Sequence, residues 1–572
     1  MTVITCFGGA NEIGGNKILL EERESRVFFD FGKSFGRYGA FFDGVFVRER
    51  VSRGLLDVLA LGLVPPLRGL LREDLIPAFE SSEVDVELIP PTGRQRSPRQ
   101  LTSVTPRAQD AFWEHWERAL PGVFRDLRRP DGPAVDAILL SHAHQDHISD
   151  LQYVSADIPG AASRMTAFIG KVLLDAGLSG LGGVPYISPR APRPEGELAS
   201  ERDTPYRARP FHFFDRAFEG EASEDPLATA EGFWGYGGSK GIAKADPLPS
   251  LPLRLQTYPV DHSLFGAVGM AIETEAGWIG YSGDLRFHGK AGKQSWAYAD
   301  ALAKLRPAAL LCEGTRLTGA NATTEAQVTD ACLQAVRRAE GRLVVGDFAP
   351  RNVERLLAFV EIAGETGRRL LVQPKDAYLL RAMHLADPEV PDAMADLRVG
   401  LYADPKVSQF DWEKRVRDRY AASIVTPLDV RQAPGDFLLA FSLTDVADLL
   451  DIEYLLKGKP GGAYLFSNSQ AYDDEQMVDL VRLWNWTAHL GLTLEGLEPH
   501  RDERGVVVKV TPVEGYHASG HAAAAELAEF VRRVQPRRLI AIHTENAPAW
   551  RDLLHGASID LVIPSYAEPI RL

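Results

Sequence analysis

The sequence has little that would link it to an oxidising compartment or to a membrane. Its 572 residues include three cysteines, Cys6, Cys312 and Cys332, and no CxxC pair, so a disulfide framework and a cysteine-based zinc site are both excluded. No window holds the run of about eighteen apolar residues that crosses a bilayer. The N-terminus has no basic segment followed by an apolar stretch, so we expect no export signal. These absences predict a cytoplasmic protein with no membrane partner.

An excess of positive charge is missing too. The 63 basic and 78 acidic residues give a net charge of −15, which argues against a protein that coats nucleic acid by bulk electrostatics. A nuclease stays possible, because an enzyme that binds divalent cations needs carboxylates, and a basic channel can lie on an acidic body. The 45% hydrophobic and 25% charged residues are typical of folded proteins. At ~150 residues per domain, the length predicts more than one domain.

Short apolar segments predict where strands lie. From residue 308 onward strands alternate with helices, which is typical of βαβ units on a mostly parallel sheet. The expected strands before this point are Val3–Cys6, Lys17–Leu20, Val27–Asp30, Ala137–Leu140, Leu253–Val260 and Trp278–Ser282. Those after it are Ala308–Cys312, Arg342–Gly346, Leu370–Gln373, Phe437–Phe441, Ala463–Phe466, Val506–Val510 and Leu539–His543, with helices over Asn352–Gly364, Ala377–Leu385 and Ala522–Val534.

Two stretches depart from these patterns. Leucine spacing predicts a helical stretch over Arg48–Arg72 that is broken at Pro65-Pro66. A loop rich in proline, arginine and serine follows over Pro90–Arg107, and we interpret the whole of Phe35–Arg129 as an insertion. Residues 185–241 are rich in proline, glycine and aromatic residues, which predicts a surface loop or an active-site lid. We expect both stretches to border the catalytic cleft.

The strongest chemical signal follows the expected strand Ala137–Leu140. There His142-x-His144-x-Asp146-His147 supplies four metal-ligand side chains within six residues. Packing does not explain them, because burying histidine or aspartate without a partner is costly. A metal ion supplies the partner, and imidazole and carboxylate ligands suit Zn²⁺ and Mn²⁺ alike. Alternate residues can point into one site, while the adjacent pair can turn toward a second.

This motif resembles the HxHxDH signature of the metallo-β-lactamase superfamily, and the family's other motifs occur here in order. Asp30, which ends the strand Val27–Asp30, resembles the first aspartate, which orients the ligands without being one. His262 in Val-Asp-His-Ser resembles the third motif, and Asp284 in Tyr-Ser-Gly-Asp resembles the bridging carboxylate of the fourth.

The second half is similar to the β-CASP nuclease subfamily, in its ribonuclease J-like branch. Cys312-Glu313-Gly314-Thr315 resembles motif A. Tyr516–Ala522 reads Tyr-His-Ala-Ser-Gly-His-Ala and resembles motif B, with His521 as the matching residue. Ala541–Asn546 resembles motif C, and the opening Gly-Gly-Ala-Asn-Glu-Ile-Gly-Gly-Asn and Asp347–Asn352 are close to the same branch.

The resemblance implies an α/β fold: an αββα metallo-β-lactamase sandwich with an inserted β-CASP domain built on a mostly parallel sheet. We expect residues 1–310 to form the first part of the sandwich, with insertions near 35–129 and 185–241. Residues 311–480 would form the β-CASP domain and 481–572 the last part of the sandwich. The chain ends 29 residues after His543, so we expect it to lack the C-terminal domain of ribonuclease J. A homodimer is one possible assembly, and the sequence leaves this open.

The resemblance also implies roles for individual residues. Two divalent ions, Zn²⁺ or Mn²⁺, would be held by seven ligands: His142, His144 and His262 on one ion, Asp146, His147 and His543 on the other, and Asp284 between them. Two such ions can activate water and clamp a phosphate. The catalytic residues would be Asp146, Asp284, Glu313 and His521, with Glu313 raising the pKa of His521 so that it can protonate the leaving oxygen. Phosphate-binding candidates are His517, Ser519, Gly520, Asn468 and Ser469.

We therefore favour a metal-dependent hydrolase that degrades or processes single-stranded RNA, in a 5′-to-3′ exonuclease mode with endonuclease action as a second mode. The first alternative is a β-CASP nuclease acting on DNA. The second is an RNA-binding scaffold that has lost catalysis, which the complete ligand set disfavours. A lactonase or thioesterase is a further alternative, disfavoured because those reactions need no second histidine–carboxylate pair.

Overall fold

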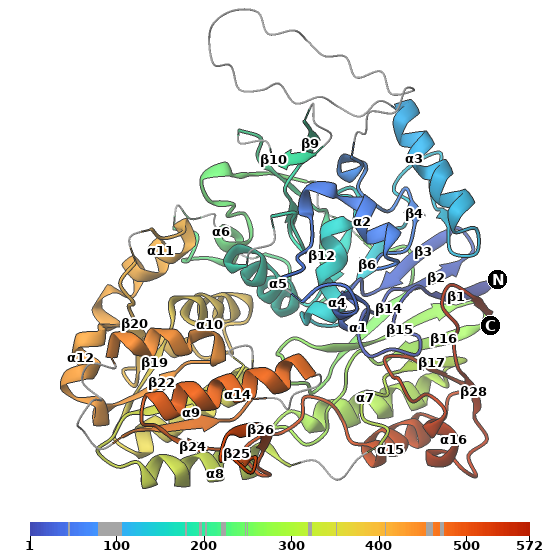
Figure 1. Cartoon of the computed structure of the whole chain (residues 1–572). Helices are drawn as coiled ribbons and strands as arrows, with labels where there is room; N and C mark the ends of the chain where they lie inside the picture. Colours follow the sequence, from blue (N-terminus) through green and yellow to red (C-terminus); the bar gives the residue numbers. More distant parts are fainter. Residues whose placement is uncertain are drawn as a thin grey trace, which may run out of the picture.

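The computed structural model describes residues 1–572 except 44–45, 78–105, 178–179, 194–196, 201–202, 219–222, 224, 246–247, 249, 319–322, 350–351, 407, 453–460 and 469–473. Three large sheets organise the chain (Figure 1). Two of them stack face to face, and the third belongs to a separate lobe. No helix among the described residues is long and apolar enough to cross a membrane.

The first sheet of the stacked pair has the order β12-β7-β6-β3-β2-β1-β29. The antiparallel pairs β1–β2, β2–β3 and β1–β29 bring both chain termini to one edge, while β3, β6, β7 and β12 are parallel. Its strands are β1 (Thr2–Cys6), β2 (Ile18–Glu22), β3 (Ser25–Phe29), β6 (Ala137–Leu139), β7 (Gly160–Ala162), β12 (Phe211–Phe213) and β29 (Pro569–Arg571).

The second sheet has the order β14-β15-β16-β17-β27-β28. It begins with two antiparallel pairs and continues in parallel from β16 to β28. Its strands are β14 (Leu255–Pro259), β15 (Val268–Thr274), β16 (Gly277–Tyr281), β17 (Ala309–Cys312), β27 (Arg538–Ala541) and β28 (Asp560–Val562).

Side chains alternate between the two faces of each strand, so apolar residues fill the space between the two sheets and also cover their outer faces. Phe29 and Leu139 of the first sheet meet Met270 and Leu311 of the second between the sheets. The outer face of the second sheet is covered by α7 (Gly292–Leu305), α15 (Ala524–Val534) and α16 (Ala549–Leu553), which pack around the fully buried Trp550. Strands with both faces buried are the pattern expected of a sandwich covered by helices.

The third sheet is entirely parallel, with the order β21-β20-β19-β22-β18-β23-β24. Apolar residues of α8 (Glu325–Arg338), α9 (Val353–Glu365) and α10 (Pro374–Ala386) cover one face and those of α14 (Asp474–His489) the other. The strands are β18 (Val344–Asp347), β19 (Arg369–Val372), β20 (Val399–Tyr402), β21 (Ile424–Val425), β22 (Phe437–Ala440), β23 (Ala463–Phe466) and β24 (Thr493–Glu495).

The predicted fold class is confirmed: an αββα sandwich with an inserted domain on a parallel sheet. The expected boundary at residue 480 is too early, because α14 runs to His489 and β24 still pairs with β23 of the third sheet. The expected strand at Val506–Val510 forms, but as β26 (Val507–Pro512) of a two-stranded hairpin with β25 (Leu497–Arg501), not as part of a large sheet.

The predictions for the two insertions are wrong in part. Within Arg48–Arg72 only α2 (Leu55–Ala60) is α-helical. It cannot extend toward Arg48, because Gly54 has a φ of +54°, and it ends before Pro65-Pro66 is reached. The described part of Phe35–Arg129 packs on the outer face of the first sheet, through buried residues such as Leu59, Trp113 and Trp116. Most of the loop Pro90–Arg107 lies outside the described residues.

The stretch 185–241 is not a bare loop. It contains β8 (Tyr186–Ile187), β9 (Arg190–Pro192), β10 (Leu198–Ser200), β11 (Tyr206–Ala208), β12 and α6 (Ala230–Trp234). Phe211 and Phe233 are buried in the core. These aromatic side chains therefore anchor the segment to the body of the protein, whereas the aromatic residues of a mobile lid would be exposed to solvent.

Replacing Trp550 with alanine tests the helix layer on the second sheet. Because Trp550 is fully buried among α15, α16 and β27, we expect Trp550→Ala to lower the free energy of unfolding by about 3–5 kcal/mol, measured by urea denaturation. Leu397, which is 91% exposed, is the control, and Leu397→Ala should change it by less than about 0.5 kcal/mol. Equal small effects from both variants would contradict the packing described.

Candidate active site

The candidate ligands collect at one edge of the stacked sheets because they follow strands whose carboxyl ends meet there. β3 and β6 run parallel in the first sheet, as do β16, β17 and β27 in the second. The side chains that follow these strands and β14 are Asp30 after β3, His142 to His147 after β6, His262 after β14, Asp284 after β16, Glu313 after β17 and His543 after β27.

One group of ligand atoms comprises His142, His144, His262 and Asp284. The Nδ1 atom of His144 lies 3.0 Å from Nε2 of His142 and 3.0 Å from Nε2 of His262. Asp284 Oδ2 lies 3.4 Å from His142 Nε2 and 3.7 Å from His262 Nε2. One ligand atom of each residue lies within 4.8 Å of the others, a spacing at which four ligands can share one ion.

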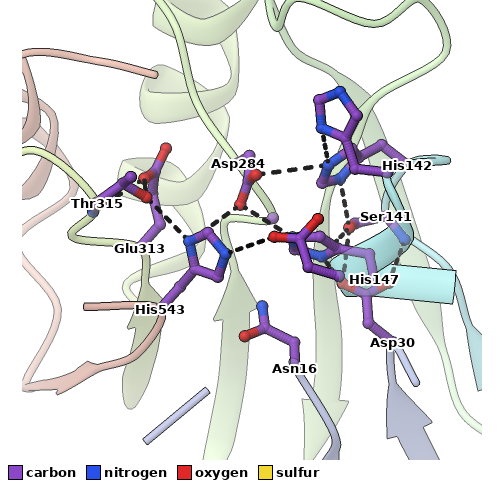
Figure 2. A network of polar contacts seen from close by, with 12 residues as sticks. Asn16, Asp30, Ser141, His142, His147, Asp284, Glu313, Thr315 and His543 are labelled. Carbon is purple, nitrogen blue, oxygen red and sulfur yellow. Dashed lines mark hydrogen bonds and ion pairs between the residues drawn. The ribbon is translucent and has the colours of Figure 1, made fainter. Parts of the chain in front are cut away.

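A second group lies on the other side of Asp284. Asp146, His147 and His543 bring ligand atoms within the same 4.8 Å, with Asp146 Oδ2 at 3.2 Å from His543 Nε2 and 3.7 Å from His147 Nε2. Asp284 Oδ1 lies 3.4 Å from His147 Nε2 and 3.6 Å from His543 Nδ1. Figure 2 shows Asp284 between His142 and His543. Each of its oxygens thus faces a different group.

Unpartnered atoms test whether these residues suit a metal. Both carboxylate oxygens of Asp284 and Nε2 of His147 are buried with no hydrogen-bond partner among the described residues. A buried polar atom without a partner costs free energy, and a bound metal ion would remove this cost. Burial holds the pKa of His142 and of His262 well below the usual range, which keeps these imidazoles neutral as metal ligands must be. Burial opposes ionisation of Asp284, but His543 and His147 hold its pKa well below the usual range.

Asp30 fixes the orientation of His147. Its Oδ2 lies 2.7 Å from His147 Nδ1 and accepts hydrogen bonds from the hydroxyls of Ser141, at 2.7 Å, and Tyr281, at 2.5 Å. Asp30 Oδ1 accepts the Ser141 amide at 2.7 Å. With Nδ1 directed at Asp30, Nε2 of His147 is left to face Asp284, as in carboxylate–histidine–metal arrangements.

Glu313 and His521 form an acid–base pair next to Asp284. His521 Nδ1 lies 3.3 Å from Glu313 Oε2 and 3.8 Å from Asp284 Oδ2. Burial opposes the charged imidazole, but Glu313 and Asp284 raise the pKa of His521 to about 9. Glu313 is held by the Leu285 amide at 2.6 Å and by the Thr315 hydroxyl at 2.7 Å. The pair can hold a proton beside the ligand groups.

The phosphate-binding candidates differ in their burial and in their hydrogen-bond partners. Gly520 presents its carbonyl to His262 Nδ1 at 2.7 Å, and Ser519 Oγ accepts the His521 amide. The helix α15 starts at Ala524, later than the expected Ala522, so these two residues precede the helix and are not part of its first turn. His517 is half-buried, and burial lowers its pKa to about 4. Asn468 donates to Asp347 at 3.1 Å, and Ser469 lies outside the described residues.

Two glycines in the first part of the chain allow the backbone to approach Asp146. A Cβ at Gly32 would lie 1.7 Å from the Asp146 carbonyl oxygen. Gly14 has a φ of +77°, and a Cβ there would lie 2.7 Å from Asp146 Cβ. The glycine-rich opening of the sequence therefore packs directly against the ligand loop.

Several residues around the site are not among the predicted site residues. Tyr281 and Thr315 lie within the quoted motifs and Ser141 directly precedes His142, and Thr315 Oγ1 lies 2.9 Å from His543 Nδ1. His288 contacts the Ser519 carbonyl at 3.0 Å and Glu526 at 3.3 Å. Their place in or beside a motif is the signal for the first three residues, and no sequence signal indicates His288.

Asp30→Asn tests whether Asp30 orients His147. The amide can still accept or donate but loses the charge that holds Nδ1–H, so we expect the affinity for Mn²⁺ to fall by ~10–100-fold, measured by calorimetry on metal-free protein. Asp157→Asn, at an exposed aspartate paired with Arg207, is the control and should bind Mn²⁺ as the wild type does. Unchanged affinity in Asp30→Asn would refute this role.

Known proteins are similar to part or most of this chain. The family model described as "Zn-dependent metallo-hydrolase RNA specificity domain" (RMMBL) matches residues 505–564, which include motifs B and C. A ribonuclease J of Mycolicibacterium smegmatis is 21% identical over 461 residues, covering 78% of this chain and 65% of that protein. A ribonuclease J of Corynebacterium glutamicum is 22% identical over 449 residues, covering 76% of this chain and 49% of that protein.

The chain thus spans less than two thirds of the length of these relatives. Among solved structures, a protein of unknown function from Enterococcus faecalis V583 is similar over 100% of both chains, with a TM-score of 0.60 and 18% identity, a likeness that shows the fold alone. The matched zinc-dependent domain and the His/Asp groups together indicate that the protein uses a divalent metal. The fold, the order of the motifs and these matches confirm the resemblance of the chain to the metallo-β-lactamase superfamily and its ribonuclease J-like β-CASP branch.

Proposed function

We propose that this protein is a two-metal phosphodiesterase that degrades or processes single-stranded RNA. The observation that carries the proposal is the position of Asp284, whose two oxygens face separate ligand groups while His521 and Glu313 lie beside it. Metal ligands alone would suit many hydrolases. The added acid–base pair suits a reaction whose leaving group needs a proton.

Two ions are supported by the number and division of the ligands. His142, His144 and His262 would hold one ion and Asp146, His147 and His543 the other, with Asp284 shared. Two divalent ions supply an activated water and neutralise charge on the phosphate. Zn²⁺ and Mn²⁺ both suit this donor set, and the matched domain is described as zinc-dependent.

The residues of the chain then have separate tasks. Asp30 keeps His147 oriented, and Gly520 keeps His262 oriented through its carbonyl. Glu313 keeps His521 protonated through Nδ1, so that Nε2–H can be given to the leaving 3′ oxygen of the scissile bond. His517, Ser519 and Gly520 are in the same loop as His521, which favours them as phosphate contacts over Asn468, whose amide is engaged by Asp347.

RNA is favoured as the substrate because the matched relatives are named ribonuclease J and the matched domain is described by RNA specificity. We further propose a 5′-to-3′ exonuclease mode with endonuclease action as a second mode, and a cytoplasmic location. Residues 1–310 and the last part of the chain would form the metallo-β-lactamase domain, and the β-CASP domain would lie between them.

Asp284→Asn tests the proposed hydrolysis most simply. The amide removes the negative charge shared by both ligand groups, so we expect release of mononucleotides from 5′-monophosphorylated single-stranded RNA to stop while the fold, monitored by circular dichroism, is retained. His142→Ala should give the same result. Full activity in either variant would refute the proposal, and equal turnover of a matched DNA oligomer by the wild type would replace RNA specificity with general nuclease action.

His521→Ala tests the proton donor separately. Loss of a general acid costs ~10²–10⁴-fold in rate, so we expect RNA turnover to fall by that factor. Hydrolysis of bis(4-nitrophenyl) phosphate, whose leaving group needs no proton, should fall much less. An equal loss on both substrates would mean that His521 supports the metal site instead.

A further inference from the structure

A buried cluster of charges lies next to the candidate metal site, where the sandwich meets the inserted domain. Five side chains belong to it, and each is at most 5% exposed. Two are arginines and three are carboxylates, so the cluster carries one formal negative charge in excess. Its members are Asp261, Arg286, Glu325, Glu354 and Arg355.

Arg286 joins the two loops that carry His262 and Asp284. It lies two residues after Asp284, and its guanidinium contacts Asp261, the neighbour of His262, through Nη2 at 2.8 Å and Nε at 3.2 Å. The Arg286 amide also donates to the Asp261 carbonyl at 2.8 Å. A planar fork held by two bonds fixes direction as well as distance, so the side chain reinforces the backbone bond that already joins these two loops.

The same guanidinium also contacts the inserted domain. Nη1 lies 3.2 Å from Glu325, the first residue of α8, and Nη2 lies 2.6 Å from Glu354, near the start of α9. Glu354 also accepts the Lys290 amide at 2.8 Å. Helices α8 and α9 are therefore docked against the loop that follows Asp284.

Arg355 extends the cluster to motif B. Its guanidinium binds Glu325 at 2.8 Å and the Ser467 carbonyl at 2.7 Å. The Ser467 hydroxyl in turn donates to the Tyr516 carbonyl at 2.6 Å, at the start of the motif B loop that holds His521. The metal-ligand loops and the loop of the proton donor are thus tied to one buried cluster.

We infer that Arg286 is a positioning residue that sets the spacing of the His262 and Asp284 loops and couples it to docking of the inserted domain. The inference rests on the proposed metal site. Burying an ion network gains little stability over apolar packing, and its better-attested use is to fix one arrangement of parts. Here the parts that need fixing are ligands contributed by different loops.

The test compares Arg286→Met with a matched arginine. Arg381 is also buried, and it joins α10 to the 185–241 segment through the Leu227 carbonyl and to Asp392. Within the described part of the chain it has no hydrogen bond or ion pair to a ligand loop. We expect Arg286→Met to lower the Mn²⁺ affinity of metal-free full-length protein by ~10–100-fold, by calorimetry. Arg381→Met should lower the melting temperature but leave Mn²⁺ binding as in the wild type.

Two further variants separate positioning from stability. Arg286→Lys keeps the charge but not the fork, and should have an intermediate affinity. In Arg286→Met/Glu354→Gln, one unpaired carboxylate is removed, so the melting temperature should recover while Mn²⁺ affinity stays low. Recovery of both together, or wild-type affinity in Arg286→Met, would overturn the inference.

The readout keeps this inference distinct from the proposed reaction. A wild-type protein that binds Mn²⁺ but cleaves no RNA would refute the ribonuclease proposal, and the variants would still decide the role of Arg286. A wild-type protein that binds neither Mn²⁺ nor Zn²⁺ would overturn both.

Discussion

The structure around the site depends on one buried carboxylate. Asp284 is 1% exposed, and its oxygens face two histidine groups that come from both sheets of the sandwich. An aspartate in such a position is tolerable only as an anion surrounded by compensating groups, because an uncompensated buried charge is among the most expensive features a protein can carry. The parallel alignment of β16, β17 and β27 is what brings Asp284, Glu313 and His543 to a common edge.

The histidines around Asp284 are held in place by residues of other motifs. His147 and His262 each have a partner on the ring nitrogen that does not face Asp284, Asp30 for His147 and the Gly520 carbonyl for His262. The Nδ1 atom of His543, which faces Asp284, also contacts the Thr315 hydroxyl. These partners come from three different motifs. The orientation of one motif is therefore enforced by another, and the inserted domain participates through motif B and the buried charge cluster.

Much of this could be predicted from the sequence, because the ligands occur as a compact motif after a strand. His142, His144, Asp146 and His147 are recognisable from spacing alone, and Asp284, His262 and His543 from order and resemblance. The parallel sheet could be predicted from alternating strands and helices. These signals are local, and local signals survive in a single sequence.

The remainder depends on contacts between distant residues. Arg286, Glu325 and Glu354 have ordinary surroundings in the sequence, and only folding brings them together. The third sheet continues past the expected boundary because β24, which follows α14, pairs with β23. The short strands between residues 185 and 241 have no clear periodicity, since each is only two or three residues long.

The most direct test of the central claim is anomalous diffraction from crystals grown with Mn²⁺. The account predicts two peaks, one on each side of Asp284, the first among His142, His144 and His262 and the second among Asp146, His147 and His543. A single peak at full occupancy with the second group empty, or peaks away from Asp284, would contradict it.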